Sequence, residues 1–156
     1  MTDVSFSLKS FQQAIRANAV DLHPSATDRN LLFHVDRPGA GVTRLAFARM
    51  KGRTVTAMVM FTQVQHYEGK PCYQIGYAVP KRYQKQGRAK EVVAAAIKEF
   101  TSGMKRREPE FYIEAIIDAQ NRASLRVAEQ LISDSPKEVT DKIAGVPALQ
   151  YLKHIK

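Results

Sequence analysis

Cysteine is almost absent from this sequence: Cys72 is the only one among 156 residues, so the chain can form neither an internal disulfide bond nor a cysteine-based metal cluster. The four histidines lie far apart along the chain, and the metal-binding pattern HExxH does not occur. No apolar run approaches the ~20 residues that cross a bilayer, and Met1–Ser5 lacks the basic start and apolar stretch of a signal peptide. These absences predict a cytoplasmic protein that binds no metal and does not enter a membrane.

Compositional breaks are lacking as well. The sequence contains no repeat, no low-complexity linker and no shift in composition that would divide it. Its length fits one domain of ordinary size, which buries about 70% of its extended-chain surface. We therefore expect residues 1–156 to form a single globular domain.

Positive charge, in contrast, is abundant and unevenly distributed. The net charge is +9, and the segment 81–107 has nine basic side chains against two acidic ones, a net charge of +7 in that segment alone. Such a segment attracts nucleic acid, an acidic partner or a phosphorylated small molecule, or it is a solvated face that only keeps the protein soluble. Charge alone does not choose between these. The basic residues are Lys81, Arg82, Lys85, Arg88, Lys90, Lys98, Lys105, Arg106 and Arg107, and the acidic ones are Glu91 and Glu99.

Helical signals dominate the first third of the chain. Phe11, Ala14 and Ile15 fall on one helical face, and Ser10 and Gln13 have the spacing of a capping box, which predicts a helix that starts at Ser10. A second short helix is predicted after Pro24. It would carry Leu31, Leu32 and Phe33, and the run Asp36–Gly41 then predicts a loop.

Three strands are predicted next. Apolar and polar side chains alternate in residues 43–50 and 54–64, and a third strand covers residues 72–79. Tight turns are expected at Lys51-Gly52 and at Tyr67–Pro71. Because the turns are short, these strands should form an antiparallel meander.

The pattern then changes to alternating helices and strands. Helical spacing covers residues 89–100, with Gly103 as the expected C-terminal stop. A buried strand at Phe111–Ile117 precedes a helix at Asn121–Ile132. Together with the meander, this order predicts a mixed α/β sheet. Two further strands are expected at 137–143 and 147–154.

The segment from Val79 to Ala89 joins the end of a strand to the start of a helix. Amides at a helix start are unpaired and carry roughly half a positive charge between them. Gly87 allows a ligand to approach the backbone closely, and Lys85 and Arg88 add positive charge. Together these features predict an anion site suited to a diphosphate.

The two best-known phosphate loops are excluded, since neither GxGxxG nor GxxxxGK followed by Ser or Thr occurs. Gln84-Lys85-Gln86-Gly87-Arg88-Ala89 instead resembles the Q/R-x-x-G-x-G/A signature of the GNAT superfamily of N-acetyltransferases. Upstream, Ile75–Pro80 resembles the family's central strand, and Arg82-Tyr83 resembles the residues that precede the signature. Downstream, Asn121–Leu131 resembles the second hallmark, a helix that opens N-x-x-S, and looks most like the RimJ and RimL branch. The resemblance covers residues 43–132.

The resemblance implies an α/β fold with a mixed, mostly antiparallel central sheet, flanked by helices on both faces. Its two central parallel strands would splay apart, and acetyl-CoA, the implied co-substrate, would lie in the gap. Gly76 would form a bulge in the first of these strands, because glycine permits the necessary backbone. An ordinary close-packed strand crossing is the alternative for this glycine.

The resemblance also assigns roles. Ala78 and Val79 would offer backbone groups to the pantetheine arm, and one strand amide would polarise the thioester carbonyl. Asn121 would contact the pantetheine amides, and Ser124 would protonate the departing thiolate as the catalytic residue. Asn121 and Ser124 also suit a plain helix cap, which stays an alternative. The implied coenzyme-binding residues are Ala78, Val79, Gln84, Lys85, Gln86, Gly87, Arg88, Ala89, Asn121 and Ser124, with those from Gln84 to Ala89 on the pyrophosphate.

An ammonium cannot attack a thioester, so some group must accept its proton, and the sequence does not determine which one. Glu68, Glu114, Asp118, His66 and Tyr151 all have suitable chemistry, directly or through water. Glu114 stands out as a carboxylate in an apolar strand, although an outward-facing strand residue or a partner of a nearby basic group is the favoured explanation.

Two positions depart from the family's pattern. Ala128 stands where many members have a tyrosine that acts as general acid, which moves that role towards Ser124. Ile132-Ser133 stands where many members end the helix with Gly-Phe, and the arrangement of the last strands is therefore less well defined by the resemblance.

Three functions are compatible with these observations. The favoured one is an N-acetyltransferase that moves an acetyl group from acetyl-CoA to a primary amine, carried by a small molecule or a protein N-terminus. The alternatives are a non-catalytic acyl-CoA-binding interaction module and, less favoured, a nucleic-acid binder that uses residues 81–107. The acceptor, the length of the acyl group and the oligomeric state, including a homodimer, are left open. Positive charge argues only against polycationic acceptors.

Overall fold

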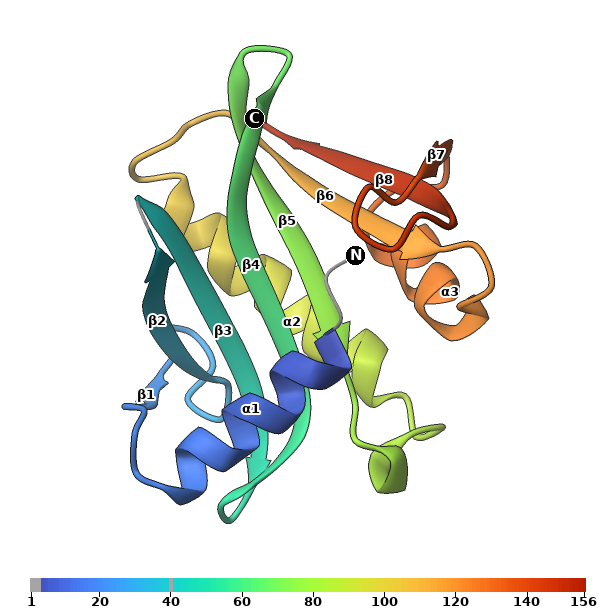
Figure 1. The fold of residues 1–156 in the computed structure, drawn as a ribbon. Helices are drawn as coiled ribbons and strands as arrows, with labels where there is room; N and C mark the ends of the chain where they lie inside the picture. The colour runs from blue at the N-terminus through green and yellow to red at the C-terminus, as the bar shows by residue number, and fades with distance from the viewer. Residues whose placement is uncertain (1–3, 40) are drawn as a thin grey trace.

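Helices cover both faces of one mixed sheet in the computed structural model, which describes residues 4–39 and 41–156 (Figure 1). Over these residues the sheet has eight strands in the order β1-β2-β3-β4-β5-β6-β8-β7, with three α-helices against it. The expected α/β fold is confirmed. Met1–Asp3 lie outside the described residues, and so does Ala40, which belongs to the predicted loop. The elements are α1 (Val4–Arg16), β1 (His23–Pro24), β2 (Leu32–Gly39), β3 (Val42–Lys51), β4 (Thr54–Tyr67), β5 (Lys70–Ala78), the 3-10 helix η1 (Lys81–Tyr83), α2 (Arg88–Met104), β6 (Phe111–Asp118), α3 (Arg122–Leu131), β7 (Lys137–Thr140) and β8 (Pro147–Ile155).

The first helix, α1, begins earlier than the sequence indicated. Its described part starts at Val4, so the capping box predicted at Ser10 is wrong. Ser10 is instead an exposed position inside the helix, which serine tolerates when its side chain faces solvent. The predicted apolar face is correct, since Phe11 and Ile15 are buried against Met58 and other residues of the sheet.

The second predicted helix is wrong, because residues 25–31 form a turn between β1 and β2, and β2 begins at Leu32. Phe33 lies opposite Phe47 of β3, and Leu31 is fully buried beneath the turn that precedes β2. Periodicity cannot separate helix from strand in so short an apolar run. Pairing with β3 decides the outcome, and it extends β2 to Gly39, into the segment predicted as a loop.

The predicted antiparallel meander is confirmed by strands β3, β4 and β5. Its second turn consists of Glu68 and Gly69, whose φ angles are +48° and +75°. The bulge expected at Gly76 is wrong, because the register between β4 and β5 runs without a shift through the pair Met60 and Gly76. In this pair of strands the register shifts near Val64 instead.

The central strands β5 and β6 separate along their length. They pair in parallel from Cys72 opposite Tyr112 to Gln74 opposite Glu114. Beyond that point β5 continues to Ala78, whereas β6 stays paired with β8 as far as Asp118. The predicted splay is therefore confirmed, and it opens a gap between the C-terminal ends of the two strands.

Two element ends differ from the expectations. Gly103 does not stop α2, which continues through it to Met104. Strand β7 ends at Thr140 rather than at residue 143. The reason is a turn at Asp141, whose carboxylate accepts the backbone N–H groups of Ile143 (2.9 Å) and Ala144 (3.1 Å).

The two faces of the sheet have different coverings. On one face Phe61, Ile75 and Ile113 pack with residues of α2 and α3 in the larger core. On the other face α1 packs on Ala46 and Met58, and Figure 1 shows this helix crossing β3 and β4. Across the described ranges, no helix is long and apolar enough to cross a membrane. The same residues contain no group of three side chains suited to hold a metal ion.

Candidate functional site

The start of α2 has the geometry that the sequence predicted. Gly87 precedes the helix in the left-handed region, with φ of 74° and ψ of 9°, a conformation that glycine adopts at little cost. The N–H of Glu91 donates to the carbonyl of Gly87 at 3.2 Å. The amides of Arg88, Ala89 and Lys90 therefore precede this bond and point out of the helix start, where they are available to an anion.

Side chains of the loop hold it against the end of β5. Gln84 donates through Nε2 to the carbonyl of Val79 at 2.9 Å. The guanidinium groups of Arg82 and Arg88 lie over the ring of buried Tyr83, 5.2 and 5.0 Å from its centroid. These contacts order the basic loop without neutralising its charge, as cation–π contacts do.

A cavity of about 700 Å³ joins the loop to the gap between the splayed strands. Nine of the ten predicted coenzyme-binding residues line this cavity. Gln86 is the exception, and its side chain instead donates a hydrogen bond to the carbonyl of Arg82 at 3.3 Å. The size suits a ligand of drug-like dimensions or larger. The predicted residues in the lining are Ala78, Val79, Gln84, Lys85, Gly87, Arg88, Ala89, Asn121 and Ser124.

Other lining residues did not emerge as coenzyme-binding residues from the sequence. Tyr77 and Tyr83 flank predicted positions, and their aromatic side chains beside the motif were a usable signal. Asp141 and Val146 come from the turn between β7 and β8. Nothing in the local sequence links that turn to the loop, and only the position of β8 beside β6 brings it to the cavity.

The start of α3 lies across the gap from β5. Asn121 caps this helix, since its Oδ1 accepts the backbone N–H of Ser124 at 3.2 Å. The hydroxyl of Tyr77 donates to the carbonyl of Ser124 at 2.7 Å. Burial, together with nearby Tyr151, raises the pKa of Tyr77, so this donor keeps its proton. The cap and the tyrosine fix Ser124 at the edge of the cavity.

The departures from the family's pattern at Ala128 and Ile132-Ser133 leave the last strands of the sheet in place. Ala128 is completely buried, where it packs in the core beneath α3. Ile132 is buried as well, and the N–H of Ser133 donates to the carbonyl of Ala128 at 3.1 Å. Strand β8 still pairs with β6 along its length.

The five proton-acceptor candidates are dispersed. Tyr151 is fully buried in the core, and His66 is exposed near the end of β4. Glu68 lies in the turn after β4. Asp118 lines the cavity at the end of β6, where its Oδ1 accepts the N–H of Gln120 at 2.8 Å. Glu114 lies where β5 and β6 separate.

Asp118 is the candidate that lines the cavity, whereas Glu114 has a carboxylate that a neighbouring side chain orients. Its neighbours Ile113 and Ala115 face the core beneath α2 and α3, so Glu114 faces the side of the sheet that carries α1. Oε2 accepts a hydrogen bond from the side-chain amide of Gln150 at 2.7 Å. This partner is neutral, so the bond orients the carboxylate without cancelling its charge.

The single cysteine gives a prediction about pH. Burial, with the Glu114 carboxylate, raises the pKa of the Cys72 thiol from 9.0 to about 12. Because the unfolded chain loses this proton at lower pH than the native protein, stability should fall as pH rises from about 9 towards 12. We expect a steeper fall of the melting temperature in the wild type than in Cys72→Ala over that range. An equal fall of the melting temperature in the two proteins would contradict the raised pKa of Cys72.

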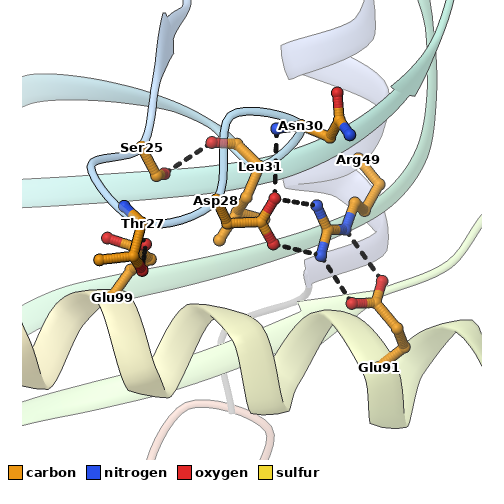
Figure 2. A network of polar contacts seen from close by, with 8 residues as sticks. All are labelled: Ser25, Thr27, Asp28, Asn30, Leu31, Arg49, Glu91 and Glu99. Carbon is orange, nitrogen blue, oxygen red and sulfur yellow. Dashed lines mark hydrogen bonds and ion pairs between the residues drawn. The ribbon is translucent and has the colours of Figure 1, made fainter.

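An ion-pair network joins the start of α2 to β3 and to the turn that precedes β2 (Figure 2). Arg49 of β3 binds Glu91 of α2 through two hydrogen bonds (2.9 and 2.7 Å) and Asp28 through two more (3.0 and 2.7 Å). The hydrogen bond from Arg49 lowers the pKa of Asp28. Nearby, Thr27 donates its backbone N–H and its hydroxyl to Glu99 of the same helix. The network fixes the position of α2 relative to β3.

Comparison with known proteins identifies the class. Residues 5–131 match the family described as an acetyltransferase (GNAT) domain, so the chain belongs to the GNAT acetyltransferases, of the RimJ/RimL type. Members of this family are acetyl-CoA-dependent N-acyltransferases. A search of curated proteins by sequence found no match.

Solved structures share the fold at low identity. An acetyltransferase of the GNAT family from Streptococcus pneumoniae has 14% identity and a TM-score of 0.53, over 76% of this chain and 70% of that one. Ribosomal-protein-S5-alanine acetyltransferase from Vibrio fischeri has 15% identity and a TM-score of 0.54, and the match covers 72% of this chain and 61% of that one. Arabidopsis thaliana NAA60 in complex with acetyl-CoA has 15% identity and a TM-score of 0.52, over 95% and 93% of the two chains.

Proposed function

We propose that this protein transfers an acetyl group from acetyl-CoA to a primary amine by direct attack. The observation that carries the proposal is the single cavity that joins the Gly87 helix start to the gap between β5 and β6. The amine nitrogen forms a bond to the acetyl carbonyl carbon, and the bond from that carbon to sulfur breaks. The products are an amide and the free thiol of coenzyme A, and no acyl group passes to the enzyme.

The residues that line the cavity suit both the diphosphate and the pantetheine arm of the coenzyme. Amides at the start of α2, with Lys85 and Arg88 beside them, suit the diphosphate. Ala78 and Val79, at the end of β5 past its last pair with β6, would offer backbone groups to the pantetheine arm. One such amide would stabilise the charge that develops on the carbonyl oxygen.

Two side chains would move protons. Ser124 lies at the cavity edge and would give a proton to the departing sulfur, directly or through water. Glu114 would take the proton of the acceptor ammonium. Ala78 lies four residues past the strand pair that contains Glu114, roughly 13 Å along an extended strand. A water relay would therefore carry this proton.

A thermal-shift screen followed by an amine panel tests the proposal. A ligand that binds only the folded state raises its stability, by about 2.7 kcal/mol at a hundred times its Kd. We expect acetyl-CoA to raise the melting temperature and at least one amine to increase thiol release. A shift without thiol release from any amine would favour the non-catalytic acyl-CoA-binding module. If acetyl-CoA, coenzyme A and longer acyl-CoAs all fail to shift the melting temperature, the proposal is wrong.

The network around Arg49 gives a prediction about coenzyme affinity. Arg49→Met leaves the Asp28 and Glu91 carboxylates unpaired, and Glu91 lies in the first turn of the helix that would receive the diphosphate. We expect acetyl-CoA to bind about two- to fivefold more weakly at low ionic strength, measured by isothermal titration. Glu91→Gln frees the Arg49 charge and should tighten binding by a similar factor.

A matched ligand and a double variant control this experiment. S-acetylpantetheine lacks the diphosphate and should bind all variants equally well. Combining Arg49→Met with Glu91→Gln restores the net charge of the network, and affinity for acetyl-CoA should return to within about twofold of the wild type. If Glu91→Gln weakens binding, or if both ligands lose affinity equally, Arg49 acts through the shape of the fold and not through charge.

A further inference from the structure

A second cavity lies on the other side of the sheet from α2 and α3. It measures about 310 Å³ and is bounded by α1 and by strands β2, β3 and β4. Ser10 and Phe11 form its helical wall, and Ala46, Met58 and Met60 form its floor. We call it the α1 groove. None of its lining residues belongs to the coenzyme cavity.

The floor of the α1 groove is apolar, whereas the polar residues of its lining are Ser7, Ser10, His34, Asp36 and Arg44. Its floor offers two methionines, which adapt their shape to bound apolar groups. The charged residues at its edge, Asp36 and Arg44, neutralise each other through two hydrogen bonds of 3.0 and 2.8 Å. The volume is near the lower limit of ligand sites and suits a small apolar group of one or two rings.

The sheet register places the α1 groove next to the coenzyme cavity. Met58 lies directly opposite Ala78, and Met60 lies directly opposite Gly76. Opposite residues of an antiparallel pair share a face, with their Cα atoms about 4.5–5.5 Å apart. Ala78 lines the coenzyme cavity. One strand spacing therefore separates the floor of the groove from the strand end beside which the thioester would lie, and a linker that spans it has to pass along β5, on which α1 also packs.

The same register connects the groove to the proposed proton acceptor. Arg44 at the groove edge lies opposite Thr62 of β4, and Thr62 lies opposite Gln74 of β5. Gln74 in turn lies beside Glu114. These residues form a polar row across the face that carries α1. An amine that leaves the groove towards the strand gap therefore reaches the side of the sheet on which the carboxylate lies.

We propose that the α1 groove holds an apolar group of the acceptor, so that the acceptor class is a primary amine joined by a short linker to an apolar body. This inference rests on the proposed acetyl transfer. The linker is short because one strand spacing separates the groove from the thioester position. The apolar body is at most about two rings in size, because the groove measures about 310 Å³ and a cavity of ~150 Å³ already holds benzene. A free arylalkylamine and a peptide with an apolar N-terminal residue share this chemistry.

Thiol release with matched amines tests the inference. We expect kcat/KM for 2-phenylethylamine to exceed that for ethanolamine by about 10- to 100-fold, the effect of burying one ring. A short peptide with N-terminal phenylalanine, compared with one that starts with serine, tells a peptide acceptor from a free amine. Ser10→Trp should fill the groove from an exposed helical position and raise KM for the preferred amine about tenfold or more.

Gln13→Trp is the control, since Gln13 is exposed on the same helix but does not line the groove. The KM of this variant for the preferred amine should stay within about twofold of the wild-type value. If Ser10→Trp does not fold, Ala46→Met fills the groove from the sheet side. The acetyl-CoA thermal shift should be unchanged in every folded variant. Three results overturn the inference alone if acetyl-CoA still raises the melting temperature. They are turnover of ethanolamine equal to that of 2-phenylethylamine, no turnover of any apolar amine, and an unchanged KM in the variant with the filled groove. Loss of the wild-type shift overturns the proposed function as well.

Discussion

Replacement of Gly87 by valine should abolish the acetyl-CoA thermal shift while the protein remains folded. Gly87 has φ of +74°, which costs an L-residue about 1–2 kcal/mol and a β-branched residue more. A Cβ at this position would meet no protein atom within 4 Å. The added side chain would instead occupy the space in front of the free amides. We expect affinity to fall about 100-fold, which corresponds to roughly 2.7 kcal/mol.

Gly52→Val is the matched control for this variant. Gly52 lies in the turn between β3 and β4, has φ of +60°, and likewise has no atom within 4 Å of a built Cβ. Both variants should therefore lose similar stability, but Gly52→Val should keep the full acetyl-CoA shift. A full shift in Gly87→Val would show that the diphosphate does not lie at the start of α2.

Replacement of Glu114 by glutamine should lower kcat by about 100-fold or more, the usual contribution of a general base. The glutamine side chain has nearly the same shape and can still accept the hydrogen bond from Gln150, but it cannot take a proton at neutral pH. Coenzyme binding should be unchanged, since Glu114 does not line the coenzyme cavity. The rate of the variant should recover at alkaline pH, where the acceptor amine has already lost its proton.

Glu68→Gln serves as the comparison for Glu114→Gln. Glu68 lies in the turn between β4 and β5, and it accepts a hydrogen bond from Tyr112 at 3.4 Å. Its replacement should leave kcat within about twofold of the wild type. If both variants lose activity equally, or if the Glu114→Gln rate does not recover at alkaline pH, Glu114 is not the proton acceptor.

Predictions from local sequence succeeded where the requirement is itself local. The turn at Glu68-Gly69 and the start of α2 at Gly87 both depend on backbone angles that few residues adopt. The cap of α3 depends on Asn121 and Ser124, which are three residues apart. Neighbouring residues set each of these features, so they could be read directly from the sequence. The binding and catalytic roles of these residues stay predictions that the variants above would test.

Apart from the helix ends expected at Ser10 and Gly103, the incorrect predictions concern segments whose conformation depends on distant partners. The apolar run around Phe33 became a strand because β3 offers it Phe47 across the sheet. Gly76 needed no bulge, because β4 pairs through it in unbroken register. The contact between Arg49 and Glu91, which was not predicted from the sequence, joins residues 42 positions apart. Local patterns carry no information about which of several compatible partners a segment will meet.

The sequence by itself determined the loop from Gln84 to Ala89 and the capped start of α3, because both are short motifs whose geometry neighbouring residues enforce. The family resemblance already implied that β5 and β6 separate with both motifs beside the gap, whereas only the tertiary structure decided that the turn between β7 and β8 reaches the same cavity and that the α1 groove lies one strand away. The physical reason is that a site between elements depends on sheet register and packing. Those are set by long-range burial and pairing, which no single segment specifies.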